Sequence, residues 1–187
     1  MNDINVKETT FIVVGLNATG RSLTLMLGAL GAKKLILVDD KVVSGSEQGY
    51  MNIDIGLKKT EAVKDTLAEI CRTEVETHNS LDSELMERLT SIINDNMVVI
   101  TCEPVGVKTK GHICRNLQTV CKAAIFVGFY EDGEPLVAVH DRSSMQEAPY
   151  QNLDTSPTAK ESLETSPLAA AQVLNFIMAR ERDLNLS

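Results

Sequence analysis

The stretch Thr10–Asp40 constrains the fold of this chain more than any other part of the sequence. An apolar run, Phe11–Val14, ends at Gly15, and Gly20 follows five residues later. An apolar helical stretch then leads to a second apolar run, Leu35–Val38. This order of strand, tight turn, helix and strand is the layout of a nucleotide-binding βαβ unit. It predicts a Rossmann-like fold.

Two acidic residues, Asp39 and Asp40, follow the second predicted strand. An acid at this position meets a ribose hydroxyl in nucleotide-binding βαβ units. The start of the helix, around residues 18–21, offers backbone N–H groups and the positive end of its dipole to a phosphate. The glycine pattern is incomplete, because Asn17 occupies the middle glycine of G-x-G-x-x-G. The unit therefore predicts a nucleotide site that departs from the usual fingerprint.

The rest of the chain alternates apolar runs with helical patterns, as α/β proteins do. The elements predicted in chain order are strand 10–14, helix 20–30 with Gly31 as its cap, strand 34–38, helix 57–71, strand 73–78, helix 81–93, strand 97–100, helix 109–122, strands 123–129 and 135–140, and helix 165–182. An Asp-Gly turn signal joins the last two strands and predicts an antiparallel hairpin. The predicted fold class is α/β: a Rossmann-like, doubly wound, mostly parallel sheet with an antiparallel C-terminal hairpin and a closing helix.

Chain length predicts one domain, because 187 residues are too few for two full domains with linkers. Residues 1–9 are predicted to form a polar arm, and residues 141–162 a flexible loop. Residues 39–56 lack periodicity, and we expect them to form a loop over the carboxyl edge of the sheet, where ligands bind in open α/β folds.

Charge and cysteine usage exclude several classes of function. A net charge of −8 and a pI of about 4.9 argue against binding to nucleic acid or to an anionic membrane surface. The four cysteines include no C-x-x-C pair, so a zinc site has no support and a reducing compartment fits. The first residues lack a signal-peptide pattern, and no apolar run approaches the roughly 20 residues that cross a bilayer. We expect a cytoplasmic protein.

Several segments, in order and spacing, resemble the ThiF/MoeB family of ubiquitin-activating-type enzymes over nearly the whole chain. They are GLNATG, LVDDKVV, DIGLKKTEAV, VVITCEP, the predicted hairpin AAIFVGFYEDGEPLVAV and the closing TSPLAAAQVLNFIM. The resemblance implies a single nucleotide-binding domain over residues 1–187 that binds ATP and Mg²⁺ and activates a carboxylate by adenylation. It also implies a homodimer.

The resemblance assigns roles to individual positions of this sequence. Those that it assigns to ATP binding are Gly15, Asn17, Ala18, Gly20, Asp39, Asp40, Lys59 and Glu103. Glu103 stands at the family's magnesium-binding aspartate and would ligate Mg²⁺ together with the phosphates. The candidate catalytic residues are Lys59, which keeps the family lysine, and Arg21. The family arginine that steadies the triphosphate cannot be placed, since no Arg lies between Arg21 and Arg72.

Non-functional interpretations of Arg21 and Lys59 stay open. Arg21 could be a solvated helix residue, and Lys59, beside Lys58, could be a surface charge. Adenylation itself needs positioning and charge neutralisation more than covalent help from the protein. The segment 141–162 has no cysteine, which argues against a cycle that passes through a thioester.

The sequence therefore predicts an enzyme that makes only an acyl-adenylate, on a small-molecule carboxylate or a carrier-protein C-terminus. One such type is the HcgE type, which activates the carboxyl group of a guanylylpyridinol precursor during assembly of an iron hydrogenase cofactor in methanogens. Two other functions stay open. One is a catalytically inactive, nucleotide-binding partner subunit, and the other is an NAD-dependent oxidoreductase that uses Asp39 on the adenosine ribose.

Overall fold

A computed structural model describes residues 4–80, 84–85, 87–88, 96–102, 123–129, 135–141 and 165–182. Its strands are β1 (Thr10–Val14), β2 (Lys34–Val38), β3 (Glu74–His78), β4 (Met97–Thr101), β5 (Ala123–Phe129) and β6 (Pro135–Asp141). Its helices are α1 (Ala18–Ala29), α2 (Lys59–Ile70) and α5 (Thr165–Arg182), with two 3₁₀ turns, η1 (Val6–Glu8) and η2 (Asn52–Asp54).

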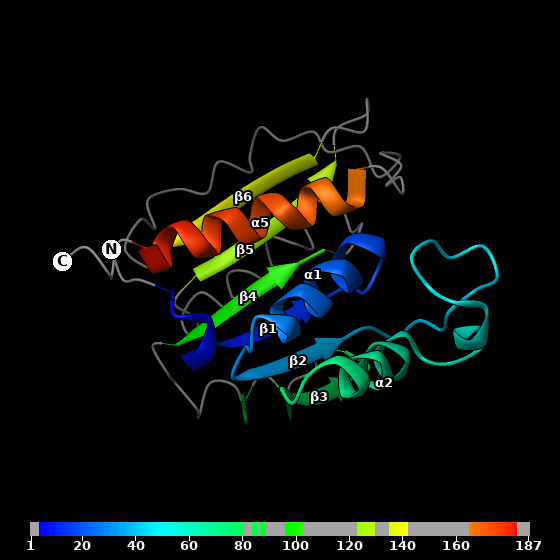
Figure 1. Ribbon diagram of the computed structural model, residues 1–187. Helices are drawn as coiled ribbons and strands as arrows, with labels where there is room; N and C mark the ends of the chain where they lie inside the picture. Colours follow the sequence, from blue (N-terminus) through cyan, green and yellow to red (C-terminus); the bar gives the residue numbers. More distant parts are fainter. Residues whose placement is uncertain are drawn as a thin grey trace.

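The six strands form one sheet in the order β3-β2-β1-β4-β5-β6 (Figure 1). Strands β1 to β5 are parallel, and β6 pairs with the edge of β5 in the antiparallel sense. The α/β class is confirmed. The connection at residues 130–134 lies outside the described residues, so the predicted Asp-Gly turn stays a prediction. Winding reverses between β1 and β4, and such a switch point is where open α/β sheets bind ligands.

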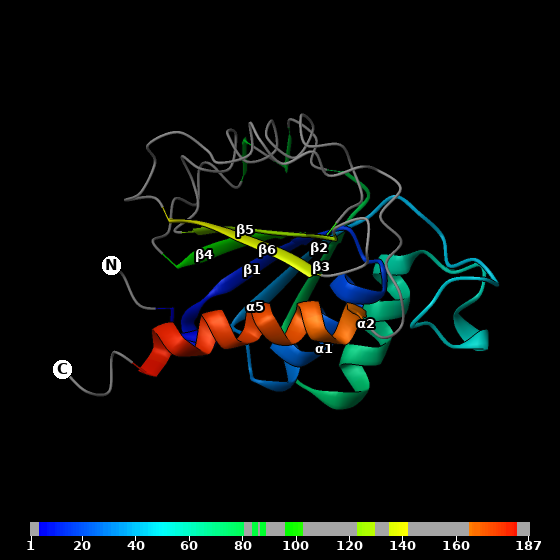
Figure 2. The ribbon, with the colours of Figure 1, turned by 90° about the horizontal axis from the view of Figure 1, so that it is seen from above.

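The core lies between the sheet and the three helices, which cover the same face of the sheet (Figure 2). Four of the five residues of β1 are buried, as expected for a central parallel strand. Ile4 and Val6 are also buried in this core. The described part of the segment predicted to form a polar arm, residues 4–9, therefore contributes two apolar side chains to the core.

Helix α1 ends as the sequence predicts, at a glycine that adopts a left-handed conformation. Gly31 has φ of +80°, its N–H donates to Gly28 O, and the N–H of Ala32 donates to Leu27 O. These two hydrogen bonds form a Schellman motif, which satisfies the last carbonyls of the helix.

The predicted helix 109–122 and most of helix 81–93 lie outside the described residues. Among the described residues, no helix is long and apolar enough to cross a membrane.

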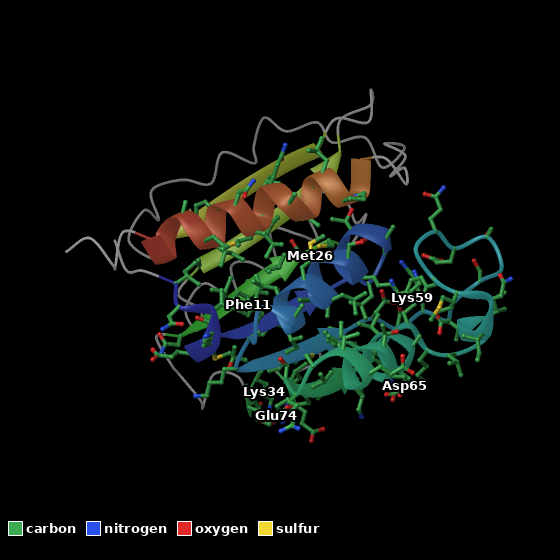
Figure 3. All side chains as sticks on the ribbon, in the orientation of Figure 1. Phe11, Met26, Lys34, Lys59, Asp65 and Glu74 are labelled. Carbon is green, nitrogen blue, oxygen red and sulfur yellow. The ribbon has the colours of Figure 1, made fainter. Side chains whose placement is uncertain are left out.

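The outer strand β3 carries a charged cluster on one face. Lys34 of β2 pairs with Glu74 at 2.7 Å and with Glu76 at 2.9 Å (Figure 3). Glu76 also pairs with His78 at 2.5 Å and with Arg88. Partial burial acts to raise the pKa of Glu76, but hydrogen bonds from Arg88, His78 and Lys34 outweigh it and lower the pKa to about 2.

Candidate functional site

The glycine turn between β1 and α1 depends on close backbone contact. Gly15 has φ of +87°, and its N–H donates to Val38 O at 2.9 Å. A Cβ on Gly20 would lie 2.0 Å from the carbonyl oxygen of Gly15, a severe overlap with backbone. Both positions therefore need glycine, the first for its conformation and the second for the approach of the helix to the turn.

Asn17, at the missing glycine position, joins three parts of the structure. Its Oδ1 accepts a hydrogen bond from the N–H of Gly20 at 2.9 Å, which makes Asn17 the N-cap of α1. Its Nδ2 donates to the carbonyl oxygen of Cys102 at 2.7 Å, just after β4. The side chain thus spans the switch point between β1 and β4.

The cap also changes the start of α1 as a phosphate site. The N–H of Gly20 donates to the Asn17 side chain, and the N–H of Arg21 donates to Asn17 O at 2.8 Å. Ala18 and Thr19 are both buried. Two of the amide groups predicted to meet a phosphate are therefore already hydrogen-bonded within the chain.

Asp39, predicted to bind a ribose, first holds the glycine turn in place. Its Oδ2 accepts from the N–H of Leu16 at 2.7 Å, and its Oδ1 accepts from the N–H of Lys41 at 2.8 Å. The residue is buried, whereas its neighbour Asp40 is exposed. An ionised carboxylate has about four acceptor positions. Asp39 thus retains capacity for a ribose hydroxyl while it links β2 to the turn.

The predicted loop after β2 projects from the domain, and hydrogen bonds join its two ends (Figure 1). At the base, Val43 N–H donates to Leu57 O at 2.8 Å, and Lys59 N–H donates to Lys41 O at 3.0 Å. Gly49, with φ of +86°, brings the chain back against Ala18 at the start of α1. The loop therefore lies against the same end of the sheet as the glycine turn, as predicted.

Within this loop, the ring of Tyr50 lies close to both candidate catalytic cations. The guanidinium carbon of Arg21 lies 5.2 Å from the ring centroid, and the Nζ of Lys59 lies 5.9 Å from it. These are cation–π distances. The Tyr50 hydroxyl donates to the carbonyl oxygen of Leu16 at 2.6 Å, so the ring is fixed to the glycine turn.

The structure distinguishes Lys59 from its neighbour. Lys59 is 4% exposed, and its Nζ lies 2.5 Å from Glu47 Oε1. Figure 3 shows it between α1 and the projecting loop. Lys58 is exposed, and its Nζ donates to Asn79 Oδ1 at 3.1 Å. Lys59 is therefore a buried cation of the site and not a surface charge.

Arg21 is likewise more than a solvated helix residue. It is half-buried against the Tyr50 ring. Within the part of the chain that the structure describes, its Nε is buried and has no hydrogen-bond partner. A buried donor without a partner is costly, which suits a group that meets an acceptor on a ligand.

The sequence analysis did not predict Tyr50 or Glu47 as candidate site residues. Tyr50 is the one aromatic residue in the predicted loop 39–56, and that signal could have found it. Burial raises the pKa of its hydroxyl above the ordinary value, the charge of Asp39 adds to this, and Arg21 opposes it. The hydroxyl therefore stays protonated and remains a hydrogen-bond donor. Glu47 has no sequence signal, since its partner Lys59 is identified only in three dimensions.

Glu103, the candidate magnesium ligand, lies outside the described residues. Among those that are described, no group of three His, Cys, Asp or Glu side chains could hold a metal ion.

Comparison with known proteins relates the chain to others through its fold. No family model matches the sequence, and neither does any curated protein. Similar solved structures include selenomethionine PaaA, with a TM-score of 0.68 and 21% identity over 94% of this chain and 57% of that one. MccB of E. coli with ATP has a TM-score of 0.66 and 16% identity, with coverage of 94% and 57%.

A further structure, of the microcin C7 biosynthetic enzyme MccB in complex with N-formylated MccA, has a TM-score of 0.65 and 15% identity, with coverage of 94% and 58%. At these identities the likeness shows the fold alone. This chain spans a little over half the length of the chains that it matches.

Proposed function

We propose that this chain binds ATP and transfers the adenylyl group to a carboxylate, as a divergent adenylyltransferase of the ThiF/MoeB type. The observation that carries the proposal is the placement of Arg21 and Lys59 around Tyr50, beside the start of α1. Two cations at the switch point of a parallel sheet suit a polyphosphate. The likeness in fold to MccB, which was crystallised with ATP, supports ATP as the nucleotide.

In the proposed reaction, a carboxylate oxygen attacks the α-phosphorus of ATP. The bond from that phosphorus to the oxygen bridging to the β-phosphate breaks, and pyrophosphate leaves with the electron pair. Negative charge grows on the phosphate oxygens, and Lys59 and Arg21 stabilise it. Asp39 accepts a hydrogen bond from a ribose hydroxyl, and the ring of Tyr50 lies within cation–π distance of both cations. Magnesium would supply further charge neutralisation, held by one carboxylate, proposed as Glu103, and by the phosphates.

The proposed substrate is the carboxylate of a small-molecule cofactor precursor, activated as an acyl-adenylate without a thioester step. Guanylylpyridinol, the substrate of the HcgE type, is one example, although neither MccB nor PaaA bears on that type. A carrier-protein C-terminus is the second substrate class, and the MccB crystals with MccA make it worth testing.

The test begins with calorimetric titration of the wild-type protein with ATP and Mg²⁺, and separately with NAD. Exchange of labelled pyrophosphate into ATP is then measured with candidate carboxylates. We expect ATP binding, and exchange that depends on the carboxylate. Tight NAD binding without ATP binding would overturn the proposal in favour of an oxidoreductase.

Lys59→Gln should weaken ATP binding by at least about tenfold, because a buried cation that meets a phosphate is lost. Lys58→Gln is the matched control, since Lys58 is adjacent but exposed and bonded to Asn79. Equal affinity in the two variants would show that Lys59 is not part of the nucleotide site.

A second candidate function is a catalytically inactive, nucleotide-binding partner subunit. The ion pair of Lys59 with Glu47 favours it, since the ammonium group is already neutralised. ATP binding without pyrophosphate exchange for any acid or carrier would support this function over the first.

We further propose that residues 1–187 form one domain that acts as a homodimer in the cytoplasm. Light scattering behind a sizing column measures the mass in solution. A mass near the 20.4 kDa of a single chain would contradict the dimer.

A further inference from the structure

The ammonium group that is proposed to meet a phosphate already has an anionic partner in its own chain. Lys59 Nζ lies 2.5 Å from Glu47 Oε1, and the side chain of Lys59 is only 5% exposed. That of Glu47 is 23% exposed, so the carboxylate lies on the outer side of the pair. A carboxylate and a phosphate are both anions that accept hydrogen bonds from an ammonium group.

Glu47 belongs to a short segment, residues 44–50, which we call the strap. The strap contains Gly45 and Gly49 on either side of Glu47. Gly49 has φ of +86°, a conformation that favours glycine, and a Cβ on Gly45 would make only an ordinary contact with Ile55 at 3.9 Å. The strap can therefore change its backbone conformation on both sides of the glutamate.

Few contacts hold the strap in its present position. Among the described residues they are the Glu47–Lys59 pair, the hydrogen bond from Tyr50 to Leu16 O, the contacts of the Tyr50 ring with Arg21 and Lys59, and the close approach of Gly49 to Ala18. The remaining hydrogen bonds are local, such as that from Glu47 N–H to Ser44 O at 3.0 Å. Loss of one charge pair would release the middle of the strap while Tyr50 stays anchored.

We propose that Glu47 competes with the polyphosphate of the nucleotide for the ammonium group of Lys59, so that the strap must release Glu47 before the ligand binds fully. The guanidinium carbon of Arg21 lies 5.2 Å from the centroid of the Tyr50 ring, and its buried Nε has no hydrogen-bond partner among the described residues. Arg21 makes the first contact with the incoming anion. This inference rests on the proposed function, since the ligand is the triphosphate part of ATP.

The competition multiplies the apparent association constant by the fraction of molecules in which the strap is released. The variant Glu47→Gln keeps the shape of the side chain and removes its charge, so the released fraction rises. If the strap is free in about one molecule in ten, Glu47→Gln binds a polyphosphate about tenfold more tightly than the wild type.

Calorimetry with two probes, inorganic tripolyphosphate and ATP, tests the proposal on the full chain in about 0.3 M salt. This salt concentration screens long-range charge effects and leaves direct contacts. The matched control is Glu61→Gln, which also removes one carboxylate; Glu61 lies on α2 and accepts a hydrogen bond from Thr77. The double variant Glu47→Gln with Lys59→Gln tests whether the increase in affinity requires Lys59. Circular dichroism confirms that each variant is folded.

We expect Glu47→Gln to bind both probes about tenfold more tightly than the wild type, and Glu61→Gln to bind them within about twofold of the wild type. The double variant should bind no more tightly than Lys59→Gln alone. If ATP binds the wild type and Glu47→Gln equally, the competition is overturned and the proposed function stands. If Glu47→Gln tightens only tripolyphosphate and no protein binds ATP, the competition stands and the proposed function fails. If neither probe binds any of the proteins, both are overturned.

Discussion

The side-chain amide of Asn17 donates a hydrogen bond to the carbonyl oxygen of Cys102, 2.7 Å away, and so connects the turn after β1 with the end of β4. The same side chain caps α1 through Gly20. Asn17, which departs from the glycine-rich fingerprint, therefore connects β1 and β4 at the edge where open α/β sheets bind ligands. It strengthens the turn, and it occupies hydrogen-bonding groups that a phosphate would otherwise meet.

Asn17→Ala should reduce the free energy of unfolding by about 2 kcal/mol, the sum of a lost N-cap and a lost side-chain hydrogen bond. Asn17→Ser should lose about half as much, since serine still caps α1 but is too short to reach Cys102. Urea unfolding followed by circular dichroism measures both. Equal stability of the serine variant and the wild type would mean that the bond to Cys102 contributes nothing.

Gly20→Ala should destabilise the protein by about 3 kcal/mol or more, because the new Cβ would lie 2.0 Å from Gly15 O and the backbone must move. Gly45→Ala is the matched control, since its nearest neighbour would be Ile55 at 3.9 Å. Thermal unfolding of the two variants gives the comparison. A Gly20 variant as stable as the Gly45 variant would show that the turn relaxes easily.

Asp39→Ala should cost about 2–4 kcal/mol of stability, because the N–H groups of Leu16 and Lys41 both lose their acceptor. It should also abolish ATP binding. Asp39→Asn keeps one acceptor oxygen and should show a smaller loss of stability. Urea unfolding and ATP titration, at a temperature where each variant is folded, separate the two effects. Unchanged ATP affinity in a folded Asp39→Ala variant would contradict the placement of the nucleotide.

The β3 cluster predicts a dependence of stability on pH. The folded pKa of Glu76 is about 2, below its ordinary value of 4.5. A carboxyl group with a lowered folded pKa stabilises the folded state above its unfolded pKa, and loses this effect as pH falls through the folded pKa. The advantage of the wild type over Glu76→Gln should therefore be full above pH 4.5 and should disappear between pH 4.5 and about 2.

Urea unfolding at several pH values between 2 and 7 measures this difference. Glu74→Gln serves as the control, since Glu74 pairs with Lys34 and its side chain is 68% exposed. Exposed ion pairs contribute little, so we expect less than about 1 kcal/mol at any pH. A Glu76→Gln variant that matches the wild type at pH 7 would show that the cluster does not stabilise the fold.

Much of the fold was predictable from short segments. Strands β1, β2 and β5 and helix α5 have the predicted bounds, because their apolar runs and turn residues are local signals. Helix α1 starts two residues before the predicted Gly20, because Asn17 is its N-cap. The Asn17 side chain is also hydrogen-bonded to the carbonyl oxygen of Cys102, 85 residues further along the chain. No local pattern contains such a contact.

The candidate site divides in the same way. By itself, the sequence determined the βαβ unit, the two required glycines and the acid after β2, since these depend on backbone geometry and on the order of neighbouring elements. Only the tertiary structure decided that Lys59 is buried and Lys58 is not, that the ring of Tyr50 lies near both Arg21 and Lys59, and that Glu47 forms an ion pair with Lys59. These properties depend on how residues 39–58 fold back against α1, and burial and ion pairing arise only when segments distant in sequence meet.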